Sequence, residues 1–363
     1  MSGPLHDVVV VGGGPAGLAL AIAAGRLGLD VLVVEPRRFP VDQPCGEGLL
    51  PAGLRALEAL GLRPAIGSGD ASPVTAIRWL DPAGPALEVA LPAPGGLGVR
   101  RTALSAALLA GAREAGARLV EAEALDHRRG PEAVEVITTA GTVRGRILVA
   151  ADGRGSAIRS REGLDAGPSR RPRFGVRRHL AVASPPGVVE VHLGDGVEAY
   201  VTPAGAGAVG VAFLFERSAP GGWPALLSRF PALASRFEGA EALSEDRGAG
   251  PLVRGSTARV RDRLVLLGDA AGSIDPLSGE GVSLGLAGAL DLAALLPGAI
   301  AAGAGGQALL GWERAWRRRQ RAAVAWTALL LGLARRPALR RGLLSAAAAV
   351  PRPIERLVAL ALG

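Results

Sequence analysis

The sequence predicts an α/β protein that also contains a β-rich part and a helical C-terminal segment. A strand-helix-strand pattern runs through residues 7–35, turn-punctuated strand patterns fill residues 73–99 and 173–216, and residues 306–363 follow a helical pattern. With 363 residues, the chain is long enough for one large domain or two, with ample core.

The pattern of residues 7–35 carries three glycines between its first strand and its helix. We expect Gly12 to make the tight turn, Gly14 to let backbone N–H groups approach a pyrophosphate, and Gly17 to let the helix lie close to the strand. The anion then lies at the positive end of the helix. Glu35 ends the second strand, where its carboxylate accepts hydrogen bonds from ribose hydroxyls. An ordinary α/β turn can also be glycine-rich, but strand, glycines, helix, strand and acid in this order predict a dinucleotide site.

The remaining elements follow from local patterns. The loop VDQPCGEGLLP precedes a short helix over about 52–60, another helix covers 101–115, and strands alternate between 118 and 153. A hairpin spans 190–216, and its second glycine motif, Gly205, Gly207 and Gly210, is interpreted as a turn because it precedes a strand. A short helix (223–237), a strand with a glycine-rich loop and helix (263–296), and tail helices broken at Pro337, Pro351 and Pro353 complete the chain.

Charge and cysteine content narrow the function classes. The net charge of +8 comes from the tail, because residues 313–363 contain 11 arginines and two acidic residues. No aromatic-interleaved basic face accompanies this charge, so we expect no nucleic-acid partner. A single cysteine excludes an internal disulfide and fits a reducing cytoplasm, and four scattered histidines predict no metal site. Without a secretion signal or an uninterrupted apolar run of membrane-spanning length, we expect a cytoplasmic protein, soluble or peripheral on the inner membrane face.

Three stretches together are more specific than any one of them. They are the N-terminal unit, Asp152-Gly153-x-x-Ser156-x-x-Arg159, and Gly268-Asp269-Ala270-Ala271 with Asp275-Pro276-x-x-Gly279-Glu280-Gly281. Over roughly residues 5–330 this set resembles the FAD-dependent oxidoreductases that include aromatic hydroxylases of the para-hydroxybenzoate hydroxylase type, geranylgeranyl reductases and flavin-dependent halogenases. The resemblance implies a Rossmann-like FAD-binding domain with a parallel sheet, interrupted by an antiparallel β-sheet substrate domain. We assign residues 1–72, 100–165 and 255–305 to the first, 73–99 and 166–254 to the second, and 306–363 to a C-terminal helical segment.

The resemblance also implies the cofactor contacts. Asp269 at a strand end accepts hydrogen bonds from a ribityl chain, and the helix that starts near Val282 points its positive end at the flavin ring. Arg101 matches the family's cofactor-contacting arginine, although a surface charge near a helix start is the alternative. The expected contacts to non-covalent FAD are Gly12, Gly14, Pro15, Ala16, Gly17, Glu35, Pro36, Arg37, Cys45, Gly46, Arg101, Asp152, Gly153, Gly268, Asp269, Pro276, Gly279, Glu280, Gly281 and Val282.

Cys45 and Glu280 are the candidate catalytic residues. The loop Cys45-Gly46-Glu47-Gly48 resembles a cysteine-glycine loop beside the flavin in geranylgeranyl reductases, although a lone cysteine is more often a small buried apolar residue. Glu280 precedes the helix next to the expected ring, a place where acids also serve as caps. Tyr200 and Pro203 loosely resemble the substrate-cavity strand of those reductases. The chain lacks the lysine and the tryptophan motif typical of halogenases, which disfavours halogenation.

Three functions stay open. We expect most an FAD-dependent monooxygenase that hydroxylates an apolar aromatic or polyketide-like molecule. The alternatives are a reductase of isoprenoid double bonds and a flavin-binding electron carrier docked on a membrane. Since no second nucleotide-binding unit is present, electrons come from transiently bound NAD(P)H or from an external donor. The Arg-rich tail helices either contact a membrane or pack on the flavin domain with their arginines in water.

Overall fold

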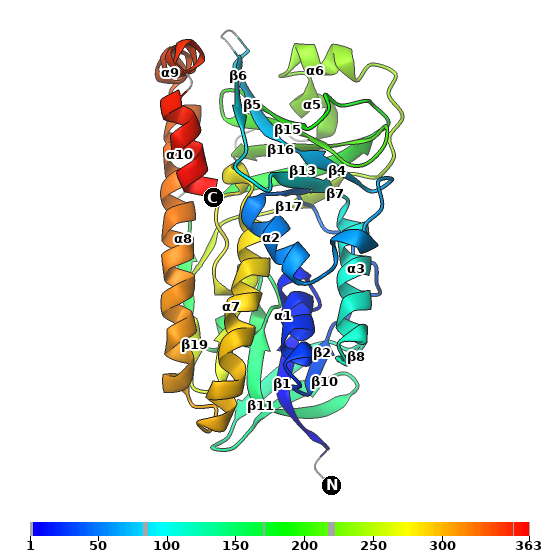
Figure 1. Cartoon of the computed structure of the whole chain (residues 1–363), viewed down its shortest axis with the longest axis vertical. Coiled ribbons are helices and arrows are strands. Elements are labelled where there is room, and N and C mark those ends of the chain that lie inside the picture. Colours follow the sequence, from blue (N-terminus) through cyan, green and yellow to red (C-terminus); the bar gives the residue numbers. More distant parts are fainter. Residues whose placement is uncertain (1–2, 83–85, 170, 217–221, 351, 363) are drawn as a thin grey trace.

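The computed structural model describes residues 3–82, 86–169, 171–216, 222–350 and 352–362. Figure 1 shows two stacked parts with a column of helices along one side. The lower part holds a sheet and its helices, the upper part holds a second sheet, and the C-terminal helices run beside both. The structure confirms the predicted α/β class.

The first sheet has eight strands; six follow the order β19-β20-β11-β1-β2-β8, β10 pairs with β11, and β9 pairs with β10. Its four central strands run parallel, because β1 pairs with β11 and β2, and β11 pairs with β20, all in parallel register. Their bounds are β1 Leu5–Val11, β2 Val31–Val34, β8 Arg118–Val120, β9 Ala124–Arg129, β10 Val134–Thr138, β11 Gly141–Ala150, β19 Val260–Arg261 and β20 Leu264–Leu266. Chain segments far apart in sequence therefore place their strand ends at one edge.

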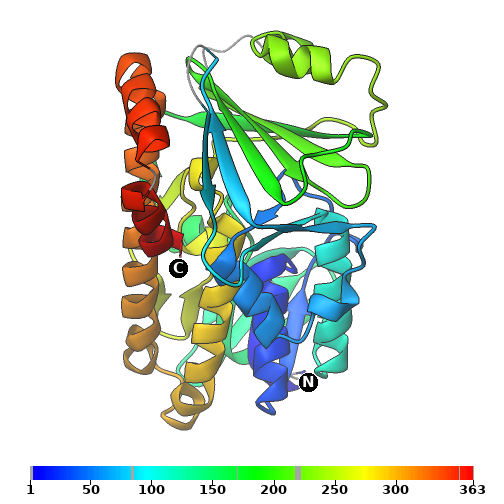
Figure 2. The same cartoon turned by 45° about the horizontal axis from the view of Figure 1, so that its top comes forward.

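The second sheet has seven strands in the order β17-β13-β16-β15-β14-β5-β6 (Figure 2). All neighbours are antiparallel except β14 and β5. The strands are β5 Ala76–Leu80, β6 Ala86–Ala90, β13 Arg173–Leu180, β14 Val188–Leu193, β15 Val197–Pro203, β16 Val209–Glu216 and β17 Arg247–Ala249. All lie within segments 73–99 and 166–254. Gly205 and Gly207 have positive φ between β15 and β16, which confirms the predicted hairpin turn.

Smaller elements join the two sheets. Helix α2 (Pro51–Ala59) and a three-stranded sheet of β3 (Gly48–Leu49), β4 (Ala71–Val74) and β7 (Gly96–Val99) lie at the junction. On the opposite side, β12 (Asp165–Pro168) pairs with β18 (Arg254–Ser256), next to α4 (Ala157–Arg161). The chain crosses between the two parts through these segments several times.

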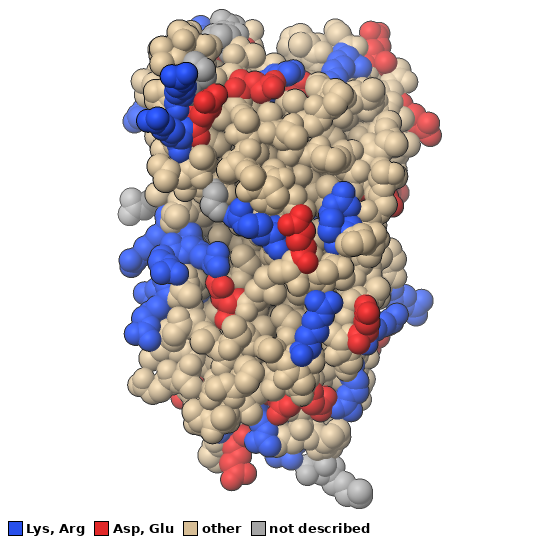
Figure 3. Space-filling view, in the orientation of Figure 1, with Lys and Arg blue, Asp and Glu red and all other residues tan. Residues whose placement is uncertain are grey.

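The C-terminal helices are α8 (Gly306–Ala334), α9 (Pro337–Ala349) and α10 (Arg352–Leu362). Helix α8 packs on α7 (Gly281–Ala301), whereas α9 and α10 pack on β6 of the second sheet. Pro337 starts α9 as predicted, and Pro351 lies outside the described residues. Helix α9 ends at Ala349 and α10 starts at Arg352, so Pro353 lies in the first turn after the predicted break. Proline is tolerated there because the first-turn N–H groups have no intrahelical acceptor. Arginines gather along this side of the molecule (Figure 3).

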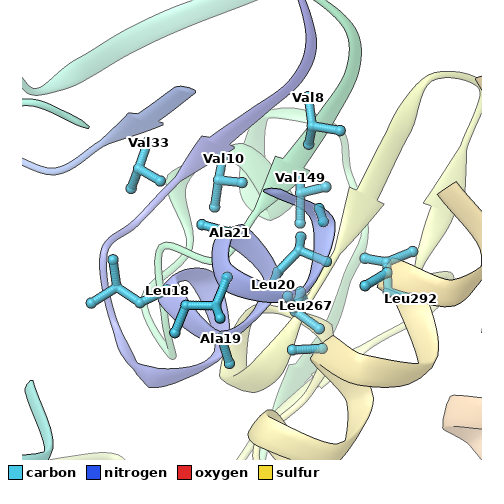
Figure 4. Close-up of a cluster of buried hydrophobic side chains, with 14 of the residues drawn as sticks. Val8, Val10, Leu18, Ala19, Leu20, Ala21, Val33, Val149, Leu267 and Leu292 are labelled. Atoms are coloured by element: carbon cyan, nitrogen blue, oxygen red, sulfur yellow. The ribbon is translucent and has the colours of Figure 1, made fainter. Parts of the chain in front are cut away.

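The main core lies between the first sheet and the helices α1 (Pro15–Arg26), α3 (Arg101–Glu114) and α7. Figure 4 shows side chains of β1, α1 and α7 interlocking there, including Val10, Leu20 and Leu292. Within the described residues, α7 is the one helix long and apolar enough to cross a membrane, and half of its apolar window is buried. Asp291 in this helix pairs with Arg319 of α8 at 2.6 Å.

Candidate functional site

One cavity of about 830 Å³ runs between the two parts of the fold. It begins at the glycine loop of the first sheet, passes the loops before β3 and α7, and ends between the second sheet and the C-terminal helices. Lining side chains thus come from β1 near the N-terminus and from α10 near the C-terminus. The polar and the apolar residues separate into two ends of this cavity.

Gly12 and Gly17 have the expected mechanical roles, and Gly14 has open space beside it. Gly12 has φ +110°, and a Cβ there would lie 2.3 Å from the Ala151 carbonyl oxygen. A Cβ on Gly17 would lie 2.0 Å from the carbonyl oxygen of Gly12, so only glycine lets α1 approach the turn. A Cβ on Gly14 would meet no protein atom within 4 Å, and this residue lines the cavity at the N-terminus of α1. The missing side chain of Gly14 therefore leaves space for a ligand, and that of Gly17 lets α1 pack against the turn.

Glu35 lines the cavity at the end of β2 and also holds the glycine loop. Its Oε2 accepts a hydrogen bond from Gly13 N at 2.7 Å, and its Oε1 accepts one from Arg37 Nε at 2.7 Å. Burial alone would raise the pKa of Glu35, but the hydrogen bonds and charge of Arg37 outweigh it and hold the pKa below its ordinary value. The carboxylate is therefore ionised, and the sequence did not indicate its bond to Gly13.

Two side chains at this end of the cavity have buried polar atoms without a partner in the protein. Arg101 is 6% exposed and has no hydrogen-bond partner for Nε or Nη1. Asp152 has none for Oδ1, and burial raises the pKa of its carboxyl. Both residues line the cavity. Because buried polar groups are normally paired, these atoms indicate a polar ligand that supplies hydrogen-bond acceptors to the guanidinium and a donor to the carboxylate.

Asp269 lies directly after β20, in the short 3-10 helix η2 (Gly268–Ala271), and lines the cavity with Gly268. Burial raises the pKa of Asp269, which Arg154, Arg101 and Arg159 partly counteract. Arg159 is 2% exposed and donates to the carbonyl oxygens of Asp269 at 3.3 Å and Ala270 at 3.1 Å. The two motifs that were separated by more than 100 residues in sequence are joined through this guanidinium.

The loop before α7 forms another wall. Pro276–Ser278 is a 3-10 helix (η3), Gly279 has φ +73°, and the loop is followed by Gly281 at the start of α7. Pro276, Gly279, Gly281 and Val282 line the cavity, whereas Glu280 is absent from the described lining residues. Its Oε2 has no partner, and burial raises the pKa of Glu280 to about 7. The placement of Glu280 gives no support to a direct role in chemistry.

The loop with Cys45 faces the same space. Cys45 and Gly46 line the cavity, together with Asp42, Gln43 and Glu47, which the sequence did not single out as contacts. Burial raises the pKa of the Cys45 thiol, so the sulfur is a neutral thiol at neutral pH. Glu47 is 2% exposed and has φ +60°, a conformation that is uncommon for a residue with a side chain. This loop is therefore held in one specific conformation.

The other end of the cavity is apolar. Tyr200 lines it, and its hydroxyl donates to the carbonyl oxygen of Leu277 at 2.8 Å. Pro203 is absent from the described lining, because it ends β15 against Gly98 of β7, where Thr202 faces the cavity instead. The C-terminal helices add walls that the sequence did not predict. The apolar lining consists of Ile77, Trp79, Val189, Val191, Ala212, Leu214, Ala249, Leu252, Trp326, Leu330 and Leu362.

Most residues expected to contact the cofactor line this cavity. Beyond those described above, Pro15, Ala16, Pro36, Arg37 and Gly153 do so. Gly17 does not, since it packs α1 on the turn. Spare donors at Arg101, space at Gly14 and the positive end of α1 suit a pyrophosphate, and the carboxylates of Glu35 and Asp269 suit the hydroxyls of ribose and ribityl groups. The residues present therefore fit FAD.

Comparison with known proteins agrees with this site. The family described as FAD binding domain matches residues 6–211. The chain is 32% identical to menaquinone reductase from Mycobacterium tuberculosis (strain ATCC 25618 / H37Rv), covering 77% of this chain and 74% of that protein. It is 32% identical to digeranylgeranylglycerophospholipid reductase 1 from Methanopyrus kandleri, covering 77% of each. It is 30% identical to a ubiquinone hydroxylase from Rhodospirillum rubrum, covering 86% of this chain and 77% of that protein.

Solved structures share the fold. A flavoprotein/dehydrogenase from Cytophaga hutchinsonii has a TM-score of 0.80 at 20% identity, covering 94% of this chain and 92% of that chain. Halogenase PltM in complex with phloroglucinol and FAD has a TM-score of 0.78 at 21% identity, covering 91% of this chain and 76% of that chain. At these identities the likeness extends to the architecture alone.

Proposed function

The chain belongs to the family of FAD binding domain proteins, and on that premise we propose that this FAD-dependent oxidoreductase reduces double bonds in the isoprenoid chain of a lipid-like substrate. The apolar end of the cavity carries the proposal. No described residue there has a charged side chain, and apart from the phenol of Tyr200 the walls are aliphatic and indole groups from the second sheet and the C-terminal helices. A long hydrocarbon chain matches such a surface, because burying it is favourable without any polar partner.

The relatives support this substrate class. Two proteins at 32% identity are named as reductases of menaquinone and of digeranylgeranylglycerophospholipid, and both molecules carry isoprenoid chains. The Cys45-Gly46-Glu47-Gly48 loop, which resembles the loop of geranylgeranyl reductases, faces the cavity. These observations move the balance from the hydroxylation expected first toward reduction.

Saturation of a carbon-carbon double bond adds a hydride to one carbon and a proton to the other. Reduced FAD supplies hydride chemistry when bound. Among the cavity residues, Cys45 suits the proton-donor role because burial raises the pKa of its thiol and keeps the proton on sulfur. The apolar walls exclude water from the reacting carbons and orient the chain. Tyr200 suits this role less, because its hydroxyl proton is held by Leu277.

The decisive experiment compares products with and without oxygen. The purified protein, loaded with FAD and reduced with dithionite under anaerobic conditions, is incubated with a geranylgeranylated glycerophospholipid, which has no quinone ring that dithionite could reduce, and the product is analysed by mass spectrometry. A gain of two hydrogen atoms per turnover supports the reductase. Turnover that requires O₂ and adds one oxygen atom contradicts it. Cys45→Ser and Cys45→Ala then test the proton donor, and full activity of the alanine variant would remove Cys45 from that role.

A monooxygenase is the second candidate. A ubiquinone hydroxylase matches 86% of this chain at 30% identity, and its named substrate also carries an isoprenoid chain. In that case the same cavity holds a quinone ring at its polar end and the attached isoprenoid chain at its apolar end. Incorporation of labelled oxygen from ¹⁸O₂ into product separates this reaction from reduction.

We also propose that electrons arrive from NAD(P)H bound transiently or from an external donor. The second glycine motif forms the β15–β16 hairpin, so the described residues contain one nucleotide-binding βαβ unit. Loss of flavin absorbance on anaerobic addition of NADH or NADPH would identify a nicotinamide donor. Reduction only by an added redox protein would identify the other route.

We propose further that helices α8 to α10 rest on an anionic bilayer at the cytoplasmic face. Eight exposed large apolar residues lie on these helices or directly after one, namely Leu310, Val324, Leu329, Leu339, Leu343, Val350, Leu357 and Leu360. Arginines lie among them, and Figure 3 shows basic side chains along this edge. Apolar side chains with surrounding arginines are complementary to anionic lipid headgroups. Since Trp326 and Leu362 of the same helices line the cavity, a lipid substrate has a short path to it.

Vesicle flotation tests this contact. Leu360 is 85% exposed, so Leu360→Glu should reduce flotation with vesicles containing phosphatidylglycerol. Leu27 is 53% exposed at the end of α1, far from these helices in the fold, and Leu27→Glu is the matched control. Equal flotation of both variants would overturn the membrane contact. It would also be overturned if the protein formed a concentration-dependent dimer in the absence of lipid and this dimer buried α10.

A further inference from the structure

Strand β13 presents three buried basic residues on one face. Side chains alternate along a strand, so Arg173, Arg177 and His179 point to the side of the cavity while Arg178 points to the other side. Arg173 is 2% exposed, Arg177 1% and His179 3%. Three buried basic side chains in one row need partners, because an unpaired buried charge is strongly unfavourable.

Arg177 and His179 hold the loop that carries Cys45. Arg177 Nη2 donates to Asp42 Oδ1 and, at 3.2 Å, to the carbonyl oxygen of Gln43. His179 Nε2 lies 2.5 Å from Glu47 Oε2. Asp42 and Glu47 flank the Cys45 segment, so both of its ends are tied to one strand.

The hydrogen-bond geometry fixes the tautomer of His179. Arg177 Nη1 lies 3.0 Å from His179 Nδ1, and a guanidinium has only donors, so Nδ1 accepts. The ring hydrogen is therefore on Nε2, which donates to Glu47. Glu47 Oε1 accepts from the backbone N of Arg101 at 2.9 Å, so the same carboxylate also fixes the start of α3. Gly210 of β16 leaves the necessary space, since a Cβ there would lie 2.9 Å from Glu47 Oε2.

Arg173 holds the loop on the opposite wall. Its Nη1 donates to Asp275 Oδ1 at 3.1 Å, and its Nη2 donates to Glu198 of β15. Asp275 Oδ1 also accepts from Leu277 N at 3.0 Å, which shapes the turn that precedes α7. Arg173 itself is not among the described lining residues, so its effect on the cavity passes through Asp275.

We propose that β13 is a positioning strand that sets both walls of the flavin cavity, with Arg177 and His179 placing the Cys45 loop and Arg173 placing the turn before α7. The two walls are formed by segments more than 200 residues apart in sequence, and β13 contacts both of them. This role concerns the geometry of the holoprotein and does not depend on whether the reaction is reduction or hydroxylation.

The single cysteine of the chain gives a direct readout of the first wall. We expect Arg177→Gln, saturated with FAD, to react with a thiol reagent at least about tenfold faster than the wild type, because its loop opens more often. The labelling rate of Arg177→Lys should lie between those of the wild type and Arg177→Gln, since an ammonium cannot bind Asp42, Gln43 and His179 at the same time. Arg177→Lys also replaces Arg177→Gln in this test if the glutamine variant does not fold. Arg247 lies 3.4 Å from Asp42, so this carboxylate keeps one cationic neighbour when Arg177 is replaced.

Arg178→Gln is the matched control on the same strand. Arg178 pairs with Asp246 at 2.6 Å and lies over the ring of Trp223, away from the cavity. We expect it to leave the labelling rate of Cys45 unchanged. Labelling of Arg177→Gln at the wild-type rate, or equal acceleration in Arg178→Gln, would overturn the proposal for the first wall.

Arg173→Gln tests the second wall separately. We expect a shifted reduction potential and visible spectrum of bound FAD, because the turn before α7 moves, with Cys45 labelling close to the wild-type rate. Unchanged flavin properties in a folded variant would overturn the role of Arg173. Acceleration of Cys45 labelling equal to that in Arg177→Gln would show general loosening and overturn the assignment of separate walls.

Discussion

The hydroxyl of Tyr200 donates a 2.8 Å hydrogen bond to the carbonyl oxygen of Leu277, across the cavity from one sheet to the turn before α7. Tyr200 is the chain's one tyrosine, it is 8% exposed, and burial raises its pKa well above the ordinary value. We expect Tyr200→Phe to lower the free energy of unfolding by about 1–2 kcal/mol, because a buried carbonyl loses its donor while the ring packing is kept. Chemical denaturation of the holoprotein measures this, and an unchanged midpoint would show that the bond is not maintained in solution.

Gly14 and Gly17 should respond in opposite ways to alanine. Gly14 has φ −72° and open space around its Cβ position, so Gly14→Ala should fold normally but bind FAD roughly tenfold or more weakly. Gly17→Ala should lower stability by about 2–3 kcal/mol, because the methyl group overlaps the Gly12 carbonyl oxygen. Thermal unfolding without FAD and fluorescence titration with FAD distinguish them. A destabilised Gly14→Ala with normal FAD affinity would reverse our assignment.

Arg101 should act on the cofactor more than on the fold. Its unpartnered Nε and Nη1 are buried, so Arg101→Gln removes a desolvated charge and should not lower the melting temperature of the FAD-free protein. The dissociation constant for FAD should rise roughly 10- to 100-fold, the range for a lost charge-assisted hydrogen bond. Arg113→Gln, an exposed residue in the last turn of the same helix, is the control. Equal FAD affinity in both variants would refute the contact.

Glu280 makes stability depend on pH. Burial raises the pKa of its carboxyl to about 7 in the folded protein, from an ordinary value of 4.5. The folded state therefore binds this proton more tightly than the unfolded state, and stability falls as pH rises between these two values. We expect Glu280→Gln to gain about 1–3 kcal/mol over the wild type at about pH 8 and little at about pH 5.

Unfolding curves at the two pH values test the prediction for Glu280. Burial also raises the pKa of Glu198 to about 7. Glu198 is unchanged in Glu280→Gln, so the stability of this variant still falls somewhat as pH rises. Glu58→Gln, an exposed substitution on α2, should follow the wild type. A gain that is the same at both pH values would show that Glu280 acts through packing instead of titration.

The sequence predicted those features that depend on neighbours along the chain. The roles of Gly12 and Gly17 follow from the conformation of one turn, and the structure has both of them. The hairpin at Gly205 and Gly207 follows from local turn chemistry in the same way. Helix α3 begins at the residue predicted for it and ends within one residue of the prediction.

The features that the sequence did not predict depend on contacts between residues far apart in the chain. Glu47 and His179 are 132 residues apart, and neither carries a local signal for meeting the other. Arg340 is 4% exposed and pairs with Asp81, although the tail pattern indicated arginines in water or on a membrane. Trp326 lines the cavity because α8 packs beside the second sheet, a relation that no periodicity encodes. Gly210, interpreted from the sequence as part of the hairpin turn, lies in β16 and leaves space for Glu47.

The cavity wall extends from Val11 to Leu362 in the chain. During translation the glycine loop leaves the ribosome before α10, and its pocket stays incomplete until α10 follows, roughly 20 to 70 s later at usual elongation rates. An N-terminal fragment therefore presents the strands and helices of the nucleotide unit without a closed pocket. We therefore expect the nascent protein to capture its cofactor late, with the faces of the first sheet exposed until then.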